Sequence, residues 1–263
     1  MTRWIVDHIP AWLLLLGLLV LIAGGAMLLQ KVLRKRFPQL TKDAHNDATQ
    51  FAFGVIGFVY AILLGFVTSA LWTQISGQDE QVRAEGTAGI QLARDRTVFG
   101  SADSDRIRVA LLNYERAALT EWSTAAAGRT NPEADNAMHD LYAAYQQVQP
   151  GTDTQRAFLS TSFANLDKLS QARTGRVMQA QTDAGPPASL WAVILLTSAL
   201  VVGCAITYGV AEPRTHYVMV ATIGLLVAAN LFLILELSYP YVGEIATSPQ
   251  PLRDIVAVLS GAA

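Results

Sequence analysis

The sequence predicts an all-α membrane protein, with four transmembrane helices and a helical-bundle domain of about four helices inserted between the second and the third. Three observations lead to this fold class. Hydrophobic residues make up 52% of the 263 residues and charged residues only 15%, with a mean hydropathy of +0.31. Four uncharged stretches each have the length of about 20 residues that crosses a bilayer. A polar segment with helical periodicity separates the second stretch from the third.

The four predicted spans cover residues 11–29, 51–72, 190–210 and 217–235. The first is too long for the apolar region of a signal peptide, and its positive cluster follows it instead of preceding it, so we expect it to be retained. We therefore expect three parts: residues 1–72 with spans one and two, 73–188 as the extramembrane domain, and 189–263 with spans three and four and a short tail.

The short loop between spans one and two predicts the orientation in the membrane. It holds five of the 19 lysine and arginine residues, namely Lys31, Arg34, Lys35, Arg36 and Lys42. Short loops rich in positive charge stay in the cytoplasm, whereas long domains cross the membrane largely regardless of charge. This places the domain of residues 73–188 outside the cytoplasm.

Turn and capping residues divide the polar segment into helices. Span two is expected to continue outward as one long helix up to the break at Gly100. Asp103 or Ser104 is expected to cap the next helix. Asn131 followed by proline predicts the start of a third helix, and a fourth begins near Asp153.

The sequence contains none of the motifs that would indicate an enzyme. We find no nucleophile elbow, phosphate-binding glycine loop, HExxH or CxxC. The single cysteine, Cys204, cannot form a disulfide within one chain. A net charge of -2 and a pI near 6.1 argue against nucleic acid as a partner. We expect no catalytic activity and no cofactor.

Asp43, His45 and Asp47 are the weak candidates for a metal site. They occupy alternate positions, which converge on one side of an extended chain but diverge on a helix. The alternative is that Asn46 or Asp47 caps span two, where a carboxylate is favourable. We favour capping and expect no metal.

Span two carries a small residue at every fourth position: Gly57, Ala61, Gly65 and Ser69. A step of four residues turns an α-helix by about 400°, so the row drifts by about 40° per step and stays on one broad face. Rows of small residues allow a neighbouring helix to approach closely. We therefore interpret this row as a helix-packing seam.

Three residues in the spans are candidates for a pore or a gate. Phe58 and Phe66 flank the seam, and rings of apolar side chains can close a pore by dewetting. Asn230 lies within span four, where its amide could bond to another helix or face a pore. Glu236, at the outer end of span four, is expected to reach water.

Glu85, Glu121, Arg173 and Arg176 lie on or beside apolar faces of three predicted helices. Such groups usually pair, so an interhelical ion network is one interpretation and a site for a small charged ligand is the other. Trp122 is expected to pack within the bundle.

Several residues and short sequence segments together resemble a bacterial family of four-pass membrane proteins, the bestrophin-like domain proteins. They are His45-Asn46-Asp47, the run from Gly57 to Phe66, Trp72, Glu85, Tyr114, Glu121-Trp122, Gly128, Arg173, Arg176, Leu190-Trp191, the tail from Tyr239 to Glu244, and Ser248-Pro249. They extend over most of the chain. Tyr241 stands where the family pattern leads us to expect phenylalanine.

The resemblance implies a location in the bacterial plasma membrane and a role in ion transport. Bestrophins are pentameric anion channels whose second span lines the pore and whose helical domain lies in the cytosol. That last property is opposite to the side that the positive loop predicts.

Two functions follow as hypotheses. The first is a homo-oligomeric channel, for anions by resemblance, with span two near the pore and inorganic ions as ligands. The second is a membrane-anchored sensor or scaffold whose extramembrane domain binds a ligand or a partner.

Overall fold

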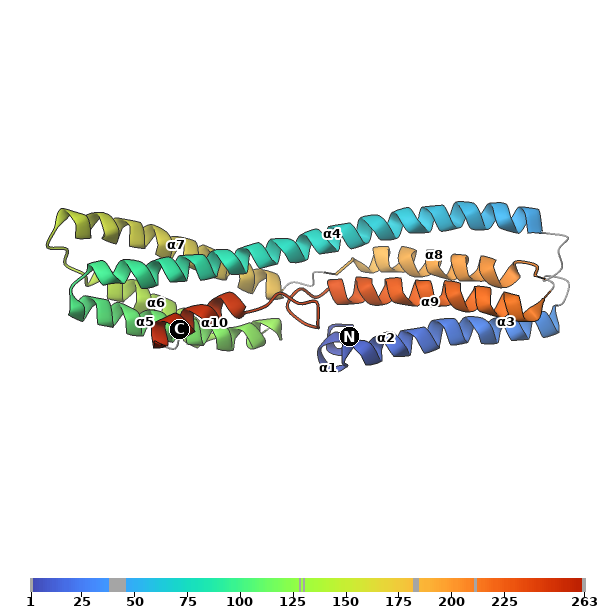
Figure 1. Ribbon diagram of the computed structural model, residues 1–263, viewed down its shortest axis with the longest axis horizontal. Helices are drawn as coiled ribbons and strands as arrows, with labels where there is room; N and C mark the ends of the chain where they lie inside the picture. The colour runs from blue at the N-terminus through green and yellow to red at the C-terminus, as the bar shows by residue number, and fades with distance from the viewer. Residues whose placement is uncertain are drawn as a thin grey trace. The chain divides into compact units, whose positions relative to one another are not determined.

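The computed structural model describes residues 2–37, 46–127, 129, 131–181, 185–210 and 212–261, and all regular structure within these ranges is helical (Figure 1). The chain forms two compact units. Unit 1 comprises Met1–Gln74 and Ala184–Ala246, and unit 2 comprises Ile75–Asp183 and Thr247–Ala263. The predicted all-α fold class is confirmed.

Unit 1 contains the apolar helices. Its elements are α1 (Thr2–His8), α2 (Ala11–Leu19), the π-helix η1 (Val20–Gly24), α3 (Gly25–Arg36), the first part of α4 (Asn46–Asp95), α8 (Ala188–Thr207) and α9 (Pro213–Leu237). Helical segments long and apolar enough to cross a membrane cover Ala11–Arg36, Thr49–Val98, Ala188–Thr207 and Pro213–Leu237. They contain the four stretches predicted as spans, apart from the last residues of the third.

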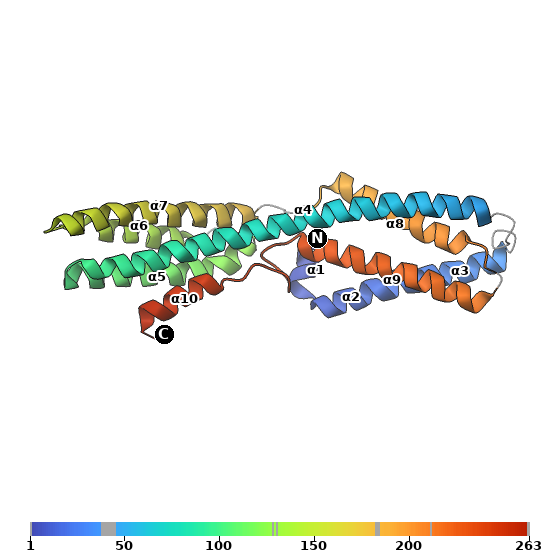
Figure 2. The ribbon, with the colours of Figure 1, turned by 45° about the horizontal axis from the view of Figure 1, so that its top comes forward.

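Helix α9 packs against α2, η1, α3 and α8 and so holds unit 1 together (Figure 2). It approaches the first span closely at Gly224, where an added Cβ would lie 2.8 Å from the Cα of Ala23. Only glycine leaves room for that backbone. Within unit 1, close helix packing at a small residue therefore occurs on α9 at Gly224. The packing seam predicted from the sequence lies on α4 instead.

A polar cluster ties α3, α8 and α9 together at the end of the unit where α3 stops and α9 starts. Arg34 Nη2 donates to the carbonyl of Val210 at 3.2 Å, and Nη1 lies 3.4 Å from Nδ1 of His216. His216 is fully buried, and its Nε2 lies 3.1 Å from the carbonyl oxygen of Ala205. Arg34, one of the five basic residues counted between spans one and two, thus helps to hold α3 against the segment between α8 and α9 and against α9.

Unit 2 is a helical bundle. It comprises the second part of α4, the 3₁₀ turn η3 (Arg96–Val98), α5 (Ser101–Ala126), α6 (Pro132–Gln146), α7 (Asp153–Gln181) and α10 (Gln250–Ser260). Its core contains fully buried side chains from α4, α5, α6, α7 and α10, among them Leu92, Leu111, Leu141, Leu169 and Leu252.

The start of α6 agrees with the sequence, whereas the start of α5 does not. Asn131 is the N-cap of α6, and its Oδ1 accepts a bond from the backbone N–H of Glu133 at 3.1 Å. Helix α5 begins at Ser101 with Gly100 as its N-cap, so Asp103 lies in the first turn. There the carboxylate still interacts favourably with the helix dipole.

Helix α10 was not anticipated from the sequence, which we interpreted there as a short tail. Leu252, Ile255 and Leu259 form its buried face, and the helix packs against α5. Gly261 ends it in the left-handed conformation with φ of 71°, a common way to terminate a helix.

Candidate functional site

The row of small residues on α4 has no helix of the described chain packed onto its glycines. An added Cβ at Gly57 or Gly65 would meet nothing within 4 Å, and Ala61 and Ser69 are exposed. The row instead lines a groove of about 910 Å³, together with further residues of α4 and with residues of α8 and α9. A helix that packs on this row would have to come from outside the described residues.

Asn230 also lines this groove, with Tyr60, Thr68 and Trp72 of α4 among its neighbours. Its Nδ2 donates to the carbonyl of Leu226 on its own helix at 2.9 Å. The amide nitrogen therefore bonds within α9, while the residue itself lines the groove.

Phe58 and Phe66 are among the most exposed side chains on α4, at 67% and 73%. Eight residues correspond to about 800° of helix rotation, so the two rings are offset by about 80° and belong to one broad face. Neither ring lines the groove.

The expectation that Glu236 reaches water is wrong, because its side chain is only 2% exposed. The chain after α9 folds back over it, and an added Cβ at Gly243 would lie 2.8 Å from its Oε2 and 3.0 Å from Cγ1 of Val6. Gly243 has φ of 97°, a conformation that other residues rarely adopt. The residues next to Glu236 in the sequence do not predict that the segment around Gly243 folds back over it.

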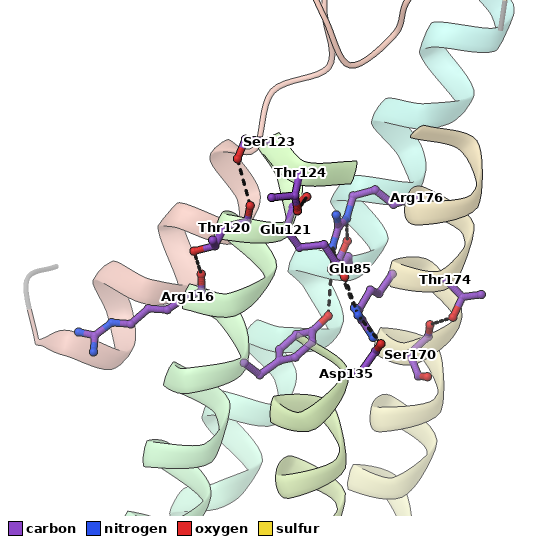
Figure 3. A network of polar contacts seen from close by, with 12 residues as sticks. Glu85, Arg116, Thr120, Glu121, Ser123, Thr124, Asp135, Ser170, Thr174 and Arg176 are labelled. Atoms are coloured by element: carbon purple, nitrogen blue, oxygen red, sulfur yellow. Dashed lines mark hydrogen bonds and ion pairs between the residues drawn. The ribbon is translucent and has the colours of Figure 1, made fainter. Parts of the chain in front are cut away.

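In unit 2, the four charged candidates lie together in one network. Figure 3 labels Glu85, Glu121 and Arg176 of this network. Arg176 of α7 makes a bidentate ion pair with Glu85 of α4, from Nε to Oε2 at 2.7 Å and from Nη2 to Oε1 at 3.0 Å. The hydroxyl of Tyr114 on α5 donates to Glu85 Oε1 at 3.0 Å. All three side chains are 1% exposed or less, so this pair is held inside the helical core.

The network continues from the core to the surface. Arg173 donates to Glu121 from Nε at 3.0 Å and from Nη2 at 2.6 Å, and Arg176 Nη2 reaches Glu121 Oε2 at 3.3 Å. Arg173 Nη2 also pairs at 2.7 Å with Asp135 of α6, whose side chain is 68% exposed. Trp122 stacks under Arg176, whose Cζ lies 5.4 Å from the ring.

These contacts connect α4, α5, α6 and α7. Each guanidinium and each carboxylate of the network bonds to a partner, so a charged ligand would have to displace an existing contact. Burial, followed by the negative charge of Glu85, raises the pKa of Tyr114 well above its usual value, so its hydroxyl remains a donor. The arrangement is that of an interhelical ion-pair network that joins the four helices.

Glu115 was not among the sequence candidates, although it follows Tyr114 directly. It is fully buried, and neither carboxylate oxygen has a hydrogen-bond partner in the part of the chain that the structure describes. The only signal in the sequence is a charged residue within the apolar row of α5.

Of the three weak metal candidates, Asp43 and His45 fall outside the described residues. Asp47 lies exposed in the first turn of α4, where a carboxylate suits the helix dipole. Across the described ranges, no group of three or more histidine, cysteine or acidic side chains is placed to hold a metal ion.

The fold and these sites define a class: an all-helical membrane protein of four spans whose second span extends into a helical bundle. The Bestrophin-like domain matches residues 20–252. The chain belongs to the Bestrophin-like family.

Solved structures show the same fold at low sequence identity. Two variants of a bacterial bestrophin homologue from Klebsiella pneumoniae align with TM-scores of 0.71 and 0.66 at 15% and 16% identity, and each alignment covers 94% of this chain and 99% of the other. A third structure, described as a membrane protein, aligns with a TM-score of 0.67 at 17% identity, over 94% and 97% of the two chains. A comparison with curated proteins gave no match.

Proposed function

We propose that several copies of this chain assemble into an ion channel that conducts anions, with α4 nearest the pore axis. Membership of the Bestrophin-like family supports a role in ion transport, and the bestrophin resemblance supports anions and a pore lined by span two. The observation that carries the proposal is the open face of α4. Its small-residue row borders an apolar groove shared with α8 and α9, Phe58 and Phe66 are exposed, and no helix among the described residues packs onto Gly57 or Gly65.

Four spans in one chain do not easily enclose a path for water. Copies related by closed rotational symmetry would cover the exposed parts of α4 and enclose a path between them. Within that assembly, Gly57, Ala61, Gly65 and Ser69 form the packing seam, and Phe58 and Phe66 are the gate candidates.

The spanning part of α4 carries no charged side chain between residues 49 and 78. Selectivity must then come from pore width, dipoles and dewetting at apolar rings. We expect a weakly selective or hydrophobically gated pore, and in a hydrophobically gated one Phe66→Ala should raise the resting leak.

Ion flux from liposomes that contain the purified protein tests this function. We expect flux above that of empty liposomes, and it should fall more when chloride is replaced by a large organic anion than when sodium is replaced by a large organic cation. Dependence on the cation alone would contradict anion conduction. Absence of flux with every combination of cation and anion would favour the sensor or scaffold function instead.

The side of the membrane on which unit 2 lies is a separate proposal. The positive loop predicts that unit 2 is extracytoplasmic, whereas the bestrophin resemblance implies the cytosol. A cysteine at the exposed position Thr154, in a Cys204→Ala background, should react with an impermeant thiol reagent on intact cells if the charge argument holds. Labelling only after lysis would contradict it.

A further inference from the structure

A second groove, of about 580 Å³, lies on unit 1 between the first span and the start of α9. Gly24 and Gly25 leave it open, because an added Cβ at either position would meet nothing within 4 Å. Val20, Leu21 and Leu28 line it with exposed fractions of 66%, 71% and 65%. The surface is therefore concave and apolar, and it belongs to a helix that is long and apolar enough to cross a membrane.

One end of this groove is polar and positively charged. Lys31 of α3 and Tyr217 of α9 line it, and none of the described residues that line it is acidic. Lys31 lies seven residues, or about two turns, beyond Gly24, so it continues the same face of the helix. The end of α3 and the start of α9 lie side by side in both views (Figures 1 and 2).

We propose that this groove binds an anionic phospholipid, with an acyl chain along Val20 to Leu28 and the phosphate at Lys31 and Tyr217. Within a span, an apolar groove faces hydrocarbon, and a lysine at the end of a span extends its ammonium to the headgroup level. The tyrosine hydroxyl can donate to a phosphate oxygen at the same depth. The charge of Lys31, with no carboxylate among the described residues that line the groove, selects a negative headgroup over a zwitterionic one.

Native mass spectrometry of the detergent-purified protein, with phosphatidylglycerol or phosphatidylcholine added, tests this site. We expect preferential retention of phosphatidylglycerol and a loss of roughly fivefold in Lys31→Gln, since one lysine near an anionic surface contributes about 1 kcal/mol. Lys35→Gln is the matched control, because Lys35 is exposed on the same helix but does not line the groove. Gly25→Phe should fill the groove and reduce retention of both lipids.

Two results would overturn the lipid site. Equal losses in Lys31→Gln and Lys35→Gln would show a general charge effect, and unchanged retention in Gly25→Phe would show that the groove is not used. Displacement of phosphatidylglycerol by inorganic phosphate would also contradict it, because the acyl chain is part of the proposed ligand.

An independent observation concerns Glu115 and the helix that covers it. An added Cβ at Gly89 of α4 would lie 2.7 Å from Oε1 of Glu115 and 2.6 Å from Cδ1 of Ile255 on α10. One turn earlier, an added Cβ at Gly86 would lie 2.7 Å from Cβ of Pro251. The two glycines thus make room for α10, and the Glu115 carboxyl is enclosed where α4, α5 and α10 meet.

The groups around Glu115 favour its neutral form. Burial raises its pKa well above the usual value, and the negative charge of Glu85 on α4 raises it further, while Arg176 on α7 opposes both. On α10 the charged residues are Arg253 and Asp254, and both are exposed. On α5 the adjoining ionisable residues are Tyr114, which donates to Glu85, and Arg116, which is exposed.

We infer that Glu115 and α10 form a proton-dependent latch: α10 stays docked while the Glu115 carboxyl is neutral, and ionisation favours its release. The direction of the pH dependence of docking follows from the number of protons bound in each state. Docking keeps the proton that free glutamate would lose, so docking is strongest below the ordinary glutamate pKa. It weakens as the pH rises from there toward the raised pKa of the docked state.

Hydrogen exchange of α10 amides in the full chain, corrected for intrinsic rates, tests the latch between about pH 5 and pH 8. We expect protection in α10 to fall by up to about tenfold per pH unit, the limit for one proton. Glu115→Gln, which mimics the neutral acid, should abolish the slope, and Asp254→Asn, which neutralises an exposed acid on α10, should keep it. Amides of α6 serve as the internal reference for global unfolding.

The same slope in Glu115→Gln as in the natural chain would overturn the latch. So would a parallel loss of protection in α6 and α10, because release of α10 alone leaves α6 in place.

Discussion

Arg176 is the largest fully buried side chain among the described residues, and it bonds to both Glu85 and Glu121. Removing one partner of a buried ion pair leaves the other charge without compensation, which typically costs about 3–5 kcal/mol. We predict that Arg176→Met lowers the stability of the full chain by an amount in this range. Thermal unfolding of the purified protein in detergent, followed by tryptophan fluorescence, measures it.

Arg156→Met is the control for this prediction, because Arg156 pairs with Asp153 at the surface and both side chains are largely exposed. Its effect should stay within about 0.5 kcal/mol. Adding Glu85→Gln to Arg176→Met should recover part of the loss. Strictly additive losses in the double variant would show that the two residues are not energetically coupled.

At the scale of elements, the two kinds of glycine in unit 1 should respond differently to substitution. Gly224 faces the backbone of Ala23 at 2.8 Å, which cannot move aside as a flexible side chain could. We predict that Gly224→Ala costs about 1–3 kcal/mol through overpacking. Gly65→Ala should cost nothing within one chain, since open space surrounds that position.

Melting temperatures of the two glycine variants, measured at low protein concentration in detergent, test this contrast. Equal destabilisation by Gly65→Ala and Gly224→Ala would contradict it. A change in assembly with Gly65→Ala, without a change in the fold of the chain, would support the seam between copies.

The N-cap of α6 supplies a further prediction. Asn131→Ala removes the acceptor for the Glu133 N–H and should destabilise α6 by about 1 kcal/mol, whereas Asn131→Asp keeps an acceptor and should be nearly neutral. Faster hydrogen exchange in the first turn of α6, in the alanine variant only, is the expected result. Similar exchange in both variants would show that the side-chain bond does not hold the helix start.

The sequence predicted the elements where local chemistry decides the structure. The uncharged runs predicted the spans, and Asn131 with the following proline predicted the start of α6. Asp153 indicated the start of α7. Continuous helical periodicity beyond Trp72 indicated the long helix α4. In each case the deciding residues lie within a few positions of the feature.

Contacts between distant segments could not be predicted in this way. Helix α10 has an apolar face of only three residues, and its docking depends on Gly86 and Gly89, which are more than 160 positions away. Glu236 was expected at the surface because nothing nearby in the sequence shows that the chain folds back over it. Pairing among Glu85, Glu121, Arg173 and Arg176 was one of two interpretations, and only the distances identify the partners.

At the scale of the whole molecule, α4 belongs to both units, because residues up to Gln74 pack in unit 1 and those from Ile75 on pack in unit 2. The proposed channel places the first part of this helix at the pore and the second part in a bundle held by the Glu85–Arg176 pair. The pore itself exists only if several copies assemble.

Electron cryomicroscopy of the purified protein in lipid nanodiscs therefore tests the central claim most directly. The account predicts a closed ring of copies around a central path, with α4 of each copy nearest the axis and Phe58 or Phe66 at its narrowest point. A monomer, a tightly packed dimer without a central path, or a ring with α4 on the outside would contradict it.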